Sequence, residues 1–188
     1  MSLRLGKTTV SVGYEVVAAI TAVLILDREN RIVCCVIAAA LHELGHLLMM
    51  RCFHIRVRSV TATLFDVLIQ AGSPADHCAD ICVTLGGPAA NLLCAAAFAP
   101  ISCSLCCANL AVGCFNLLPV MSLDGGHLLY LLLSRRFLPK TCSLIIKLTS
   151  FIFLIPLLTA GLIVLLRSGY NYSLLAAALY LLAVFIFK

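Results

Sequence analysis

Two histidines and a glutamate stand close together in an apolar part of this 188-residue chain, in the order His42-Glu43-Leu44-Gly45-His46. Residues four apart lie on the same face of a helix, so both imidazoles could bind one zinc ion. The glutamate between them could then take a proton from a water at that ion. The motif predicts zinc-dependent hydrolysis, and the alternative is a pair of polar residues that hydrogen-bond to backbone inside a helix bundle.

The apolar stretch that carries the motif, residues 32–50, is long enough to cross a bilayer. Two imidazoles and a carboxylate are costly in a membrane, and a bound metal is a partner that offsets this cost. The placement therefore favours hydrolysis within the membrane.

The composition indicates an integral membrane protein. Hydrophobic residues make up 63% of the chain and charged residues 11%, with a mean hydropathy of +1.12, whereas a soluble domain carries about 25% charge. The basic residues behind the net charge of +5 flank apolar stretches, which favours lipid headgroups over nucleic acid as partners. We expect a single all-α membrane domain, residues 1–188, with about six transmembrane helices at residues 9–26, 32–50, 79–98, 102–118, 142–166 and 172–187.

Two segments depart from simple spanning helices. Residues 55–70, after the second helix, are rich in β-branched residues and predict a small membrane-associated β-hairpin that turns near Phe65-Asp66. After the fourth helix, Pro119 and the pair Gly125-Gly126 predict broken backbone before a further apolar stretch, residues 128–133. Irregular backbone at membrane depth must be covered by protein or line a water-filled cavity.

The basic residues also predict the orientation. With six spans, most Lys and Arg residues fall on the side of the N-terminus, so both termini and the opening of the site are expected in the cytoplasm. The histidine motif and Asp124 then reach a similar depth, each within roughly 15 Å of the cytoplasmic face. Glu15, in the first span, is expected to extend to the interface or to line a substrate entrance.

A catalytic zinc usually has three protein ligands, and Asp124 is the best candidate for the third. It stands in the broken backbone beside two glycines, although it could instead cap the helix that follows. His127, three residues later, could support a metal ligand, face the substrate or lie at the interface. Asp76, His77 and Asp80 precede or begin the third span and could be simple caps.

Three motifs together resemble the site-2 protease family of intramembrane zinc metalloproteases. They are His42-Glu43-Leu44-Gly45-His46, then Gly87-Pro88-Ala89-Ala90-Asn91, and finally Asn116-Leu117-Leu118-Pro119 with Leu123-Asp124-Gly125-Gly126. The resemblance implies a catalytic core at about residues 32–133, in which His42, His46 and Asp124 bind zinc and Glu43 is the catalytic base. It also implies that Asn91 and Asn116 bind or position the substrate or the backbone, with interhelical hydrogen bonds as the alternative.

The resemblance further implies cleavage in or near the transmembrane segment of a membrane protein, and regulatory membrane partners. Among subgroups, the chain most resembles short bacterial members such as stage IV sporulation protein FB, which process a membrane-associated sigma-factor precursor. That subgroup implies a role in the bacterial cell membrane during sporulation, on a sigma-factor precursor or an anti-sigma factor. No PDZ or CBS domain is recognisable, and Met121-Ser122 and His127 replace residues common in the family.

Two other functions stay open at this point. A membrane metal transporter would also place His and Asp in broken spans, but it should show related half-sequences, and none is visible. A non-catalytic metal-binding membrane protein would keep the fold and lose Glu43 or a ligand, whereas His42, Glu43, His46 and Asp124 are all present.

Overall fold

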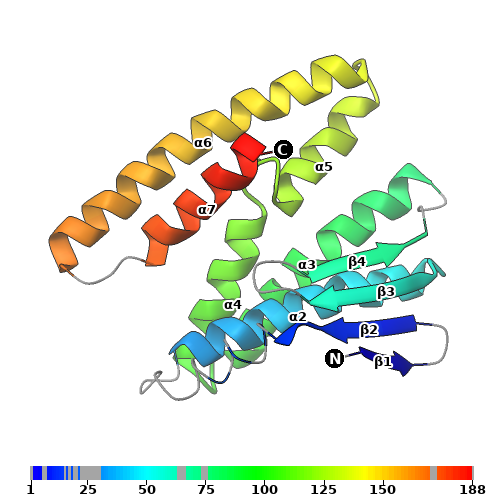
Figure 1. Cartoon of the computed structure of the whole chain (residues 1–188), viewed down its shortest axis with the longest axis horizontal. Coiled ribbons are helices and arrows are strands. Elements are labelled where there is room, and N and C mark those ends of the chain that lie inside the picture. The colour runs from blue at the N-terminus through cyan, green and yellow to red at the C-terminus, as the bar shows by residue number, and fades with distance from the viewer. Residues whose placement is uncertain are drawn as a thin grey trace. The chain divides into compact units, whose positions relative to one another are not determined.

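The computed structural model describes residues 2–5, 8–14, 16, 18, 21, 31–62, 67–72, 76–169 and 173–187 (Figure 1). Its contacts divide the chain into two compact units, Met1–Cys114 and Phe115–Lys188. The first unit holds the histidine motif, and the second holds Asp124.

Two long helices form the centre of the first unit. Helix α2 spans Arg31–Cys52 and α3 spans His77–Phe98, and the two lie side by side. Gly45 lets them approach closely, because a Cβ at this position would lie 2.7 Å from the Cβ of Ala90. Helix α4 spans Cys103–Asn116, and its buried Ala108 packs against Cys34 and Ala38 of α2.

The ends of α2 and α3 follow from local chemistry. Helix α2 ends where His54 adopts a left-handed φ of 55° and the amide of Ile55 donates to the carbonyl of Met50 at 2.8 Å. Helix α3 begins after Asp76, whose Oδ1 accepts from the amide of Ala79 at 2.7 Å. Asp76 is thus a helix cap, as its position before the third predicted span suggested.

A four-stranded sheet completes the first unit. Its strands β1 (Ser2–Leu5), β2 (Thr8–Val12), β3 (Val57–Ala62) and β4 (Val67–Ala71) lie in the order β1-β2-β3-β4. Strands β3 and β4 are antiparallel and confirm the predicted hairpin, whose turn lies outside the described residues. Strand β2 pairs in parallel with β3 and places Val10 opposite Val60.

The predicted first span, residues 9–26, is wrong at its start. Residues 9–12 belong to β2, because their β-branched side chains suit a strand and β3 supplies a partner for the backbone. Glu15 and most of the remaining residues of that span lie outside the described part of the chain.

The described residues of the second unit form three helices after α4. Helix α5 spans Asp124–Ser134, α6 spans Pro139–Ser168 and α7 spans Ser173–Phe187. Helix α7 lies against α6, where Gly161 leaves room for the backbone of Leu175. Val120, Leu154 and Leu181 form the buried core of this unit. The irregular segment before α5 confirms the predicted break, but α5 begins four residues earlier than the apolar stretch indicated.

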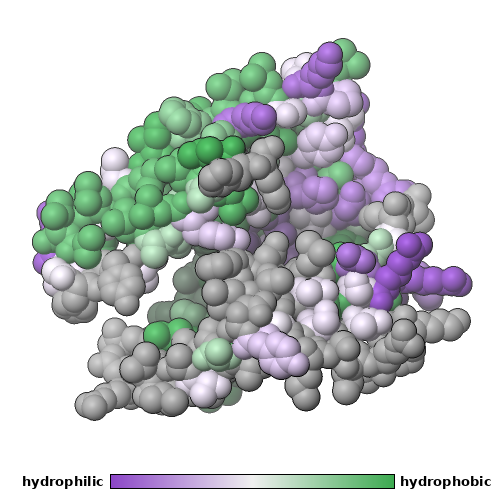
Figure 2. Space-filling model, viewed as in Figure 1, coloured by the Kyte–Doolittle hydropathy of each residue, from purple (hydrophilic) through white to green (hydrophobic). Residues whose placement is uncertain are grey.

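The described helices suit a bilayer. Three of them are long and apolar enough to cross one, at Ile32–Cys52, His77–Phe98 and Pro139–Ser168, and two shorter apolar helices cover Cys103–Asn116 and Ser173–Ile186. Figure 2 shows a hydrophobic band along α6, with hydrophilic residues at the end where α5 joins it. Leu166 of α6 is 74% exposed. Apolar exposure of this kind is typical of a helix that faces lipid.

Candidate metal centre

The two histidines of the motif face one another on α2. Their Nε2 atoms are 3.2 Å apart, and only 5% of His42 is exposed. Zinc binds imidazole nitrogen at about 2.0–2.1 Å with tetrahedral geometry, so two such ligand atoms lie roughly 3.3 Å apart. The spacing of the two rings therefore fits one shared zinc ion.

Hydrogen bonds from α3 decide which ring nitrogens carry protons. The Nδ1 atom of His42 lies 2.7 Å from Oδ1 of Asn91, and the Nδ1 atom of His46 lies 2.8 Å from the carbonyl oxygen of Val83. Both oxygens can only accept, so both Nδ1 atoms donate. In the neutral rings, the lone pairs are therefore on the two Nε2 atoms. Two lone pairs 3.2 Å apart repel one another unless a cation lies between them. Hydrogen bonds from Nδ1 to an amide or backbone oxygen, as both rings make here, are typical of histidines that bind metals.

Gly87 gives the imidazoles their space. A Cβ at this position of α3 would lie 2.7 Å from both Cε1 and Nε2 of His42, and it would also overlap Nε2 of His46. No side chain larger than a hydrogen fits there without moving the rings. The glycine of the Gly87-Pro88 motif thus belongs to the wall of the histidine site.

Asn91 connects the histidine site to the neighbouring helices by hydrogen bonds. It is fully buried, and its Nδ2 donates to the carbonyl of Ala38 at 2.8 Å and to Oδ1 of Asn109 at 2.9 Å, while its Oδ1 accepts from His42. These bonds use both N–H groups and the oxygen, so the residue links α2, α3 and α4. Sequence analysis did not single out Asn109, because an isolated asparagine in a mostly apolar helix matches no motif. It did not single out the carbonyl of Val83 either, because every residue has a backbone carbonyl.

The remaining candidates lie on α2 and in the second unit. Glu43 follows His42 on α2 and is half-buried. Asn116 is the last residue of α4. Asp124 is the first residue of α5, and Leu123 occupies the N-cap position. The alternative role of Asp124 as the cap of this helix is therefore wrong.

The backbone before Asp124 is held tightly. Buried Ser150 of α6 accepts a hydrogen bond from the amide of Met121 at 2.8 Å and donates to the carbonyl of Ile146 at 2.7 Å. Gly126 lies so close to this segment that a Cβ would overlap the carbonyl of Val120 and lie 3.0 Å from the Cα of Met121. The two glycines after Asp124 therefore allow α5 to start directly against the preceding turn.

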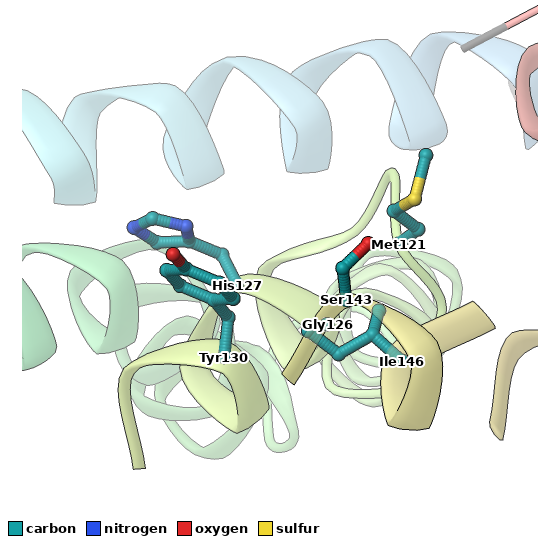
Figure 3. A pocket seen from close by; sticks show the side chains of 6 residues that line it. All are labelled: Met121, Gly126, His127, Tyr130, Ser143 and Ile146. Carbon is teal, nitrogen blue, oxygen red and sulfur yellow. The ribbon is translucent and has the colours of Figure 1, made fainter. Parts of the chain in front are cut away.

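His127 lines a cavity of about 220 Å³ in the second unit. Figure 3 shows its ring beside the side chain of Tyr130, with Met121, Ser143 and Ile146 around the same space. His127 is exposed, one turn after Asp124 on α5. Because His127 lines this cavity, it could face a substrate there, which is one of the roles that the sequence left open.

Part of the sequence is similar to known proteins. The model of Peptidase family M50 matches residues 101–157. Rip3 of Mycobacterium tuberculosis, which carries the name of a zinc metalloprotease, is 33% identical over 112 residues in two strains. This match covers 50% of the present chain and 28% of Rip3, so the chain spans less than a third of that relative.

The fold has a counterpart among solved structures. The site-2 protease from Methanocaldococcus jannaschii superimposes with a TM-score of 0.67 at 17% sequence identity, over 96% of this chain and 92% of that one. At this level of identity the likeness shows the fold alone. Part of the chain is thus similar in sequence to Peptidase family M50 and to a relative named as a zinc metalloprotease, and its fold is similar to that of a site-2 protease.

Proposed function

We propose that this chain is an intramembrane zinc metalloprotease that hydrolyses a peptide bond in or near the transmembrane segment of a membrane protein. One observation carries the proposal. The Nε2 atoms of His42 and His46 lie 3.2 Å apart, and α3 holds both rings in the tautomer that binds zinc.

His42, His46 and Asp124 would hold the metal, since each offers a ligand atom of a kind that zinc takes. For Asp124, support comes from its place in the first turn of α5 and from the firm backbone before it. A bound zinc acts as a Lewis acid that polarises a carbonyl and makes water acidic enough to lose a proton near neutral pH.

Glu43 is the proposed general base. It stands beside His42 on the same helix turn and is half-buried, where a carboxylate can take a proton from water and return it to the leaving amine. We expect water to enter from the cytoplasm, because lipid supplies none.

The substrate must present an extended backbone, since the carbonyls of a helix are occupied by its own hydrogen bonds. Strand β4 ends the described sheet and pairs only with β3 there. We propose that an unwound substrate segment adds to the β4 edge. Asn116, at the end of α4, is proposed to position the substrate or the backbone beside the reacting bond.

The finer proposal follows the resemblance of the sequence to short bacterial members. We propose a bacterial cell-membrane enzyme with both termini and the site opening in the cytoplasm. Its substrate would be a sigma-factor precursor or an anti-sigma factor, with sporulation as one setting. Regulatory membrane partners would control access to the substrate.

Co-expression with a single-span substrate tests the proposal. The parent chain should release a shortened product, and Glu43→Gln should reduce the rate about 10²–10⁴-fold because the general base is lost. His77→Ala, at the start of α3 and outside the motif, is the matched control. If Glu43→Gln cleaves as fast as the parent, the protease mechanism is wrong. Zinc uptake into vesicles, irrespective of substrate, would instead support a transporter.

A further inference from the structure

Asn109 is a buried polar residue for which the proposed chemistry has no direct use. It lies on α4 with no exposed surface, among mostly apolar and small side chains. Its Nδ2 donates to the carbonyl of Leu105 at 2.9 Å, and its Oδ1 accepts from Nδ2 of Asn91 at 2.9 Å. Because its NH₂ group and its oxygen each have a partner, the buried amide has one favoured orientation.

The orientation of the Asn109 amide favours one orientation of the Asn91 amide, which in turn favours one tautomer of His42. The carbonyl of Leu105 can only accept, so Asn109 must turn its NH₂ group toward it and its oxygen toward Asn91. Asn91 then faces Asn109 and the carbonyl of Ala38 with its NH₂ group and presents its oxygen to His42. His42 therefore donates from Nδ1–H to that oxygen, and the lone pair of its neutral ring is on Nε2.

The packing of α4 keeps this connection short. Gly113 lies one turn after Asn109, and a Cβ there would lie 3.1 Å from the Cβ of Asn91 and 3.4 Å from the carbonyl oxygen of Pro88. The close approach of α4 to α3 lets one amide reach the other without an intervening water.

We propose that Asn109 is a positioning residue for the metal: acting through Asn91, it holds His42 in the orientation and tautomer that bind zinc. The inference rests on the proposed function, because it takes a metal at His42 as given. Asn109 itself touches neither the metal nor the substrate in this account.

Zinc affinity, measured by competition with a chelator in the purified chain, tests the inference. Outer-shell partners of metal ligands typically contribute about 10–100-fold in affinity, so Asn109→Ala should bind zinc about 10-fold more weakly. Asn109→Leu keeps more of the volume and should show the same loss. Asn109→Asp, protonated when buried, keeps one acceptor and one donor and should bind nearly as tightly as the parent.

Thr84→Val is the matched control. Thr84 is another buried polar residue, 5% exposed on α3, and its hydroxyl donates to the carbonyl of Asp80 on the same helix. Removing this hydroxyl changes folding stability without touching the amide chain. Its zinc affinity should therefore equal that of the parent.

A double-mutant cycle separates positioning from a general structural role. If Asn109 acts through Asn91, then Asn91→Ala combined with Asn109→Ala should bind zinc no more weakly than Asn91→Ala alone. Losses that add, or an Asn109→Leu variant as tight as Thr84→Val, would overturn the inference. In that case a parent that binds zinc and cleaves substrate still leaves the proposed function standing, whereas a parent that binds no zinc overturns both.

Discussion

His42 and His46 point their Nε2 atoms at each other across 3.2 Å, and each ring is fixed from behind by an acceptor on the neighbouring helix. The acceptors are an amide oxygen and a backbone carbonyl, neither of which can donate to a ring nitrogen. The arrangement is thus complete within α2, α3 and α4 of the first unit, and it prepares two nitrogen ligands for one cation.

Gly87→Ala should weaken zinc binding and slow cleavage. The added Cβ would lie 2.7 Å from two atoms of the His42 ring, so the rings must shift or the helices must separate. Overpacking of this kind costs about 1–3 kcal/mol. Gly72→Ala is the control, since among the described residues a Cβ there would meet the carbonyl oxygen of Arg56 alone, at 3.9 Å. Equal zinc affinity and equal cleavage rate for the two variants would contradict the role of Gly87.

Ser150→Ala should loosen the segment that precedes Asp124. The change removes the acceptor of the Met121 amide, and a buried donor left without its partner costs about 1–3 kcal/mol. We expect a lower melting temperature and slower cleavage, because Asp124 is the proposed third ligand. Thr159→Ala, an exposed hydroxyl on the same helix that donates to the carbonyl of Pro156, should leave both unchanged. Indistinguishable behaviour of the two variants would show that Ser150 does not support the site.

Removal of the metal should stop cleavage and destabilise the chain. A zinc chelator is expected to abolish product formation, and its non-chelating isomer to have no effect. Added zinc should restore cleavage and raise the melting temperature, since a ligand at 100 times its Kd stabilises the folded state by about 2.7 kcal/mol. Cleavage that persists at full rate in the chelator would rule out a metal-dependent reaction.

The sequence predicted most helices because apolar runs of the right length leave few alternatives in a membrane. The predicted 32–50, 79–98, 142–166 and 172–187 correspond to α2, α3, α6 and α7 within a few residues. The sheet was predicted only in part. Residues 9–12 are apolar enough to begin a span, and nothing local indicates that Val10 pairs with Val60, fifty residues later.

The site divides in the same way between local and non-local information. The two histidines on one helix face follow from their spacing alone, whereas Gly87, Asn109 and the Val83 carbonyl act through contacts between helices. Asn91 was noticed only through the resemblance. Its bonds to Ala38 and Asn109 are fixed by tertiary packing, which one sequence does not reveal.

Zinc content of the purified chain tests the central claim most directly. The parent and His77→Ala should each carry about one zinc per chain after dialysis. His46→Ala should carry none, because it loses one of the two nitrogens that lie 3.2 Å apart. Equal zinc in His46→Ala and the parent, or a parent that takes up no zinc, would contradict the account.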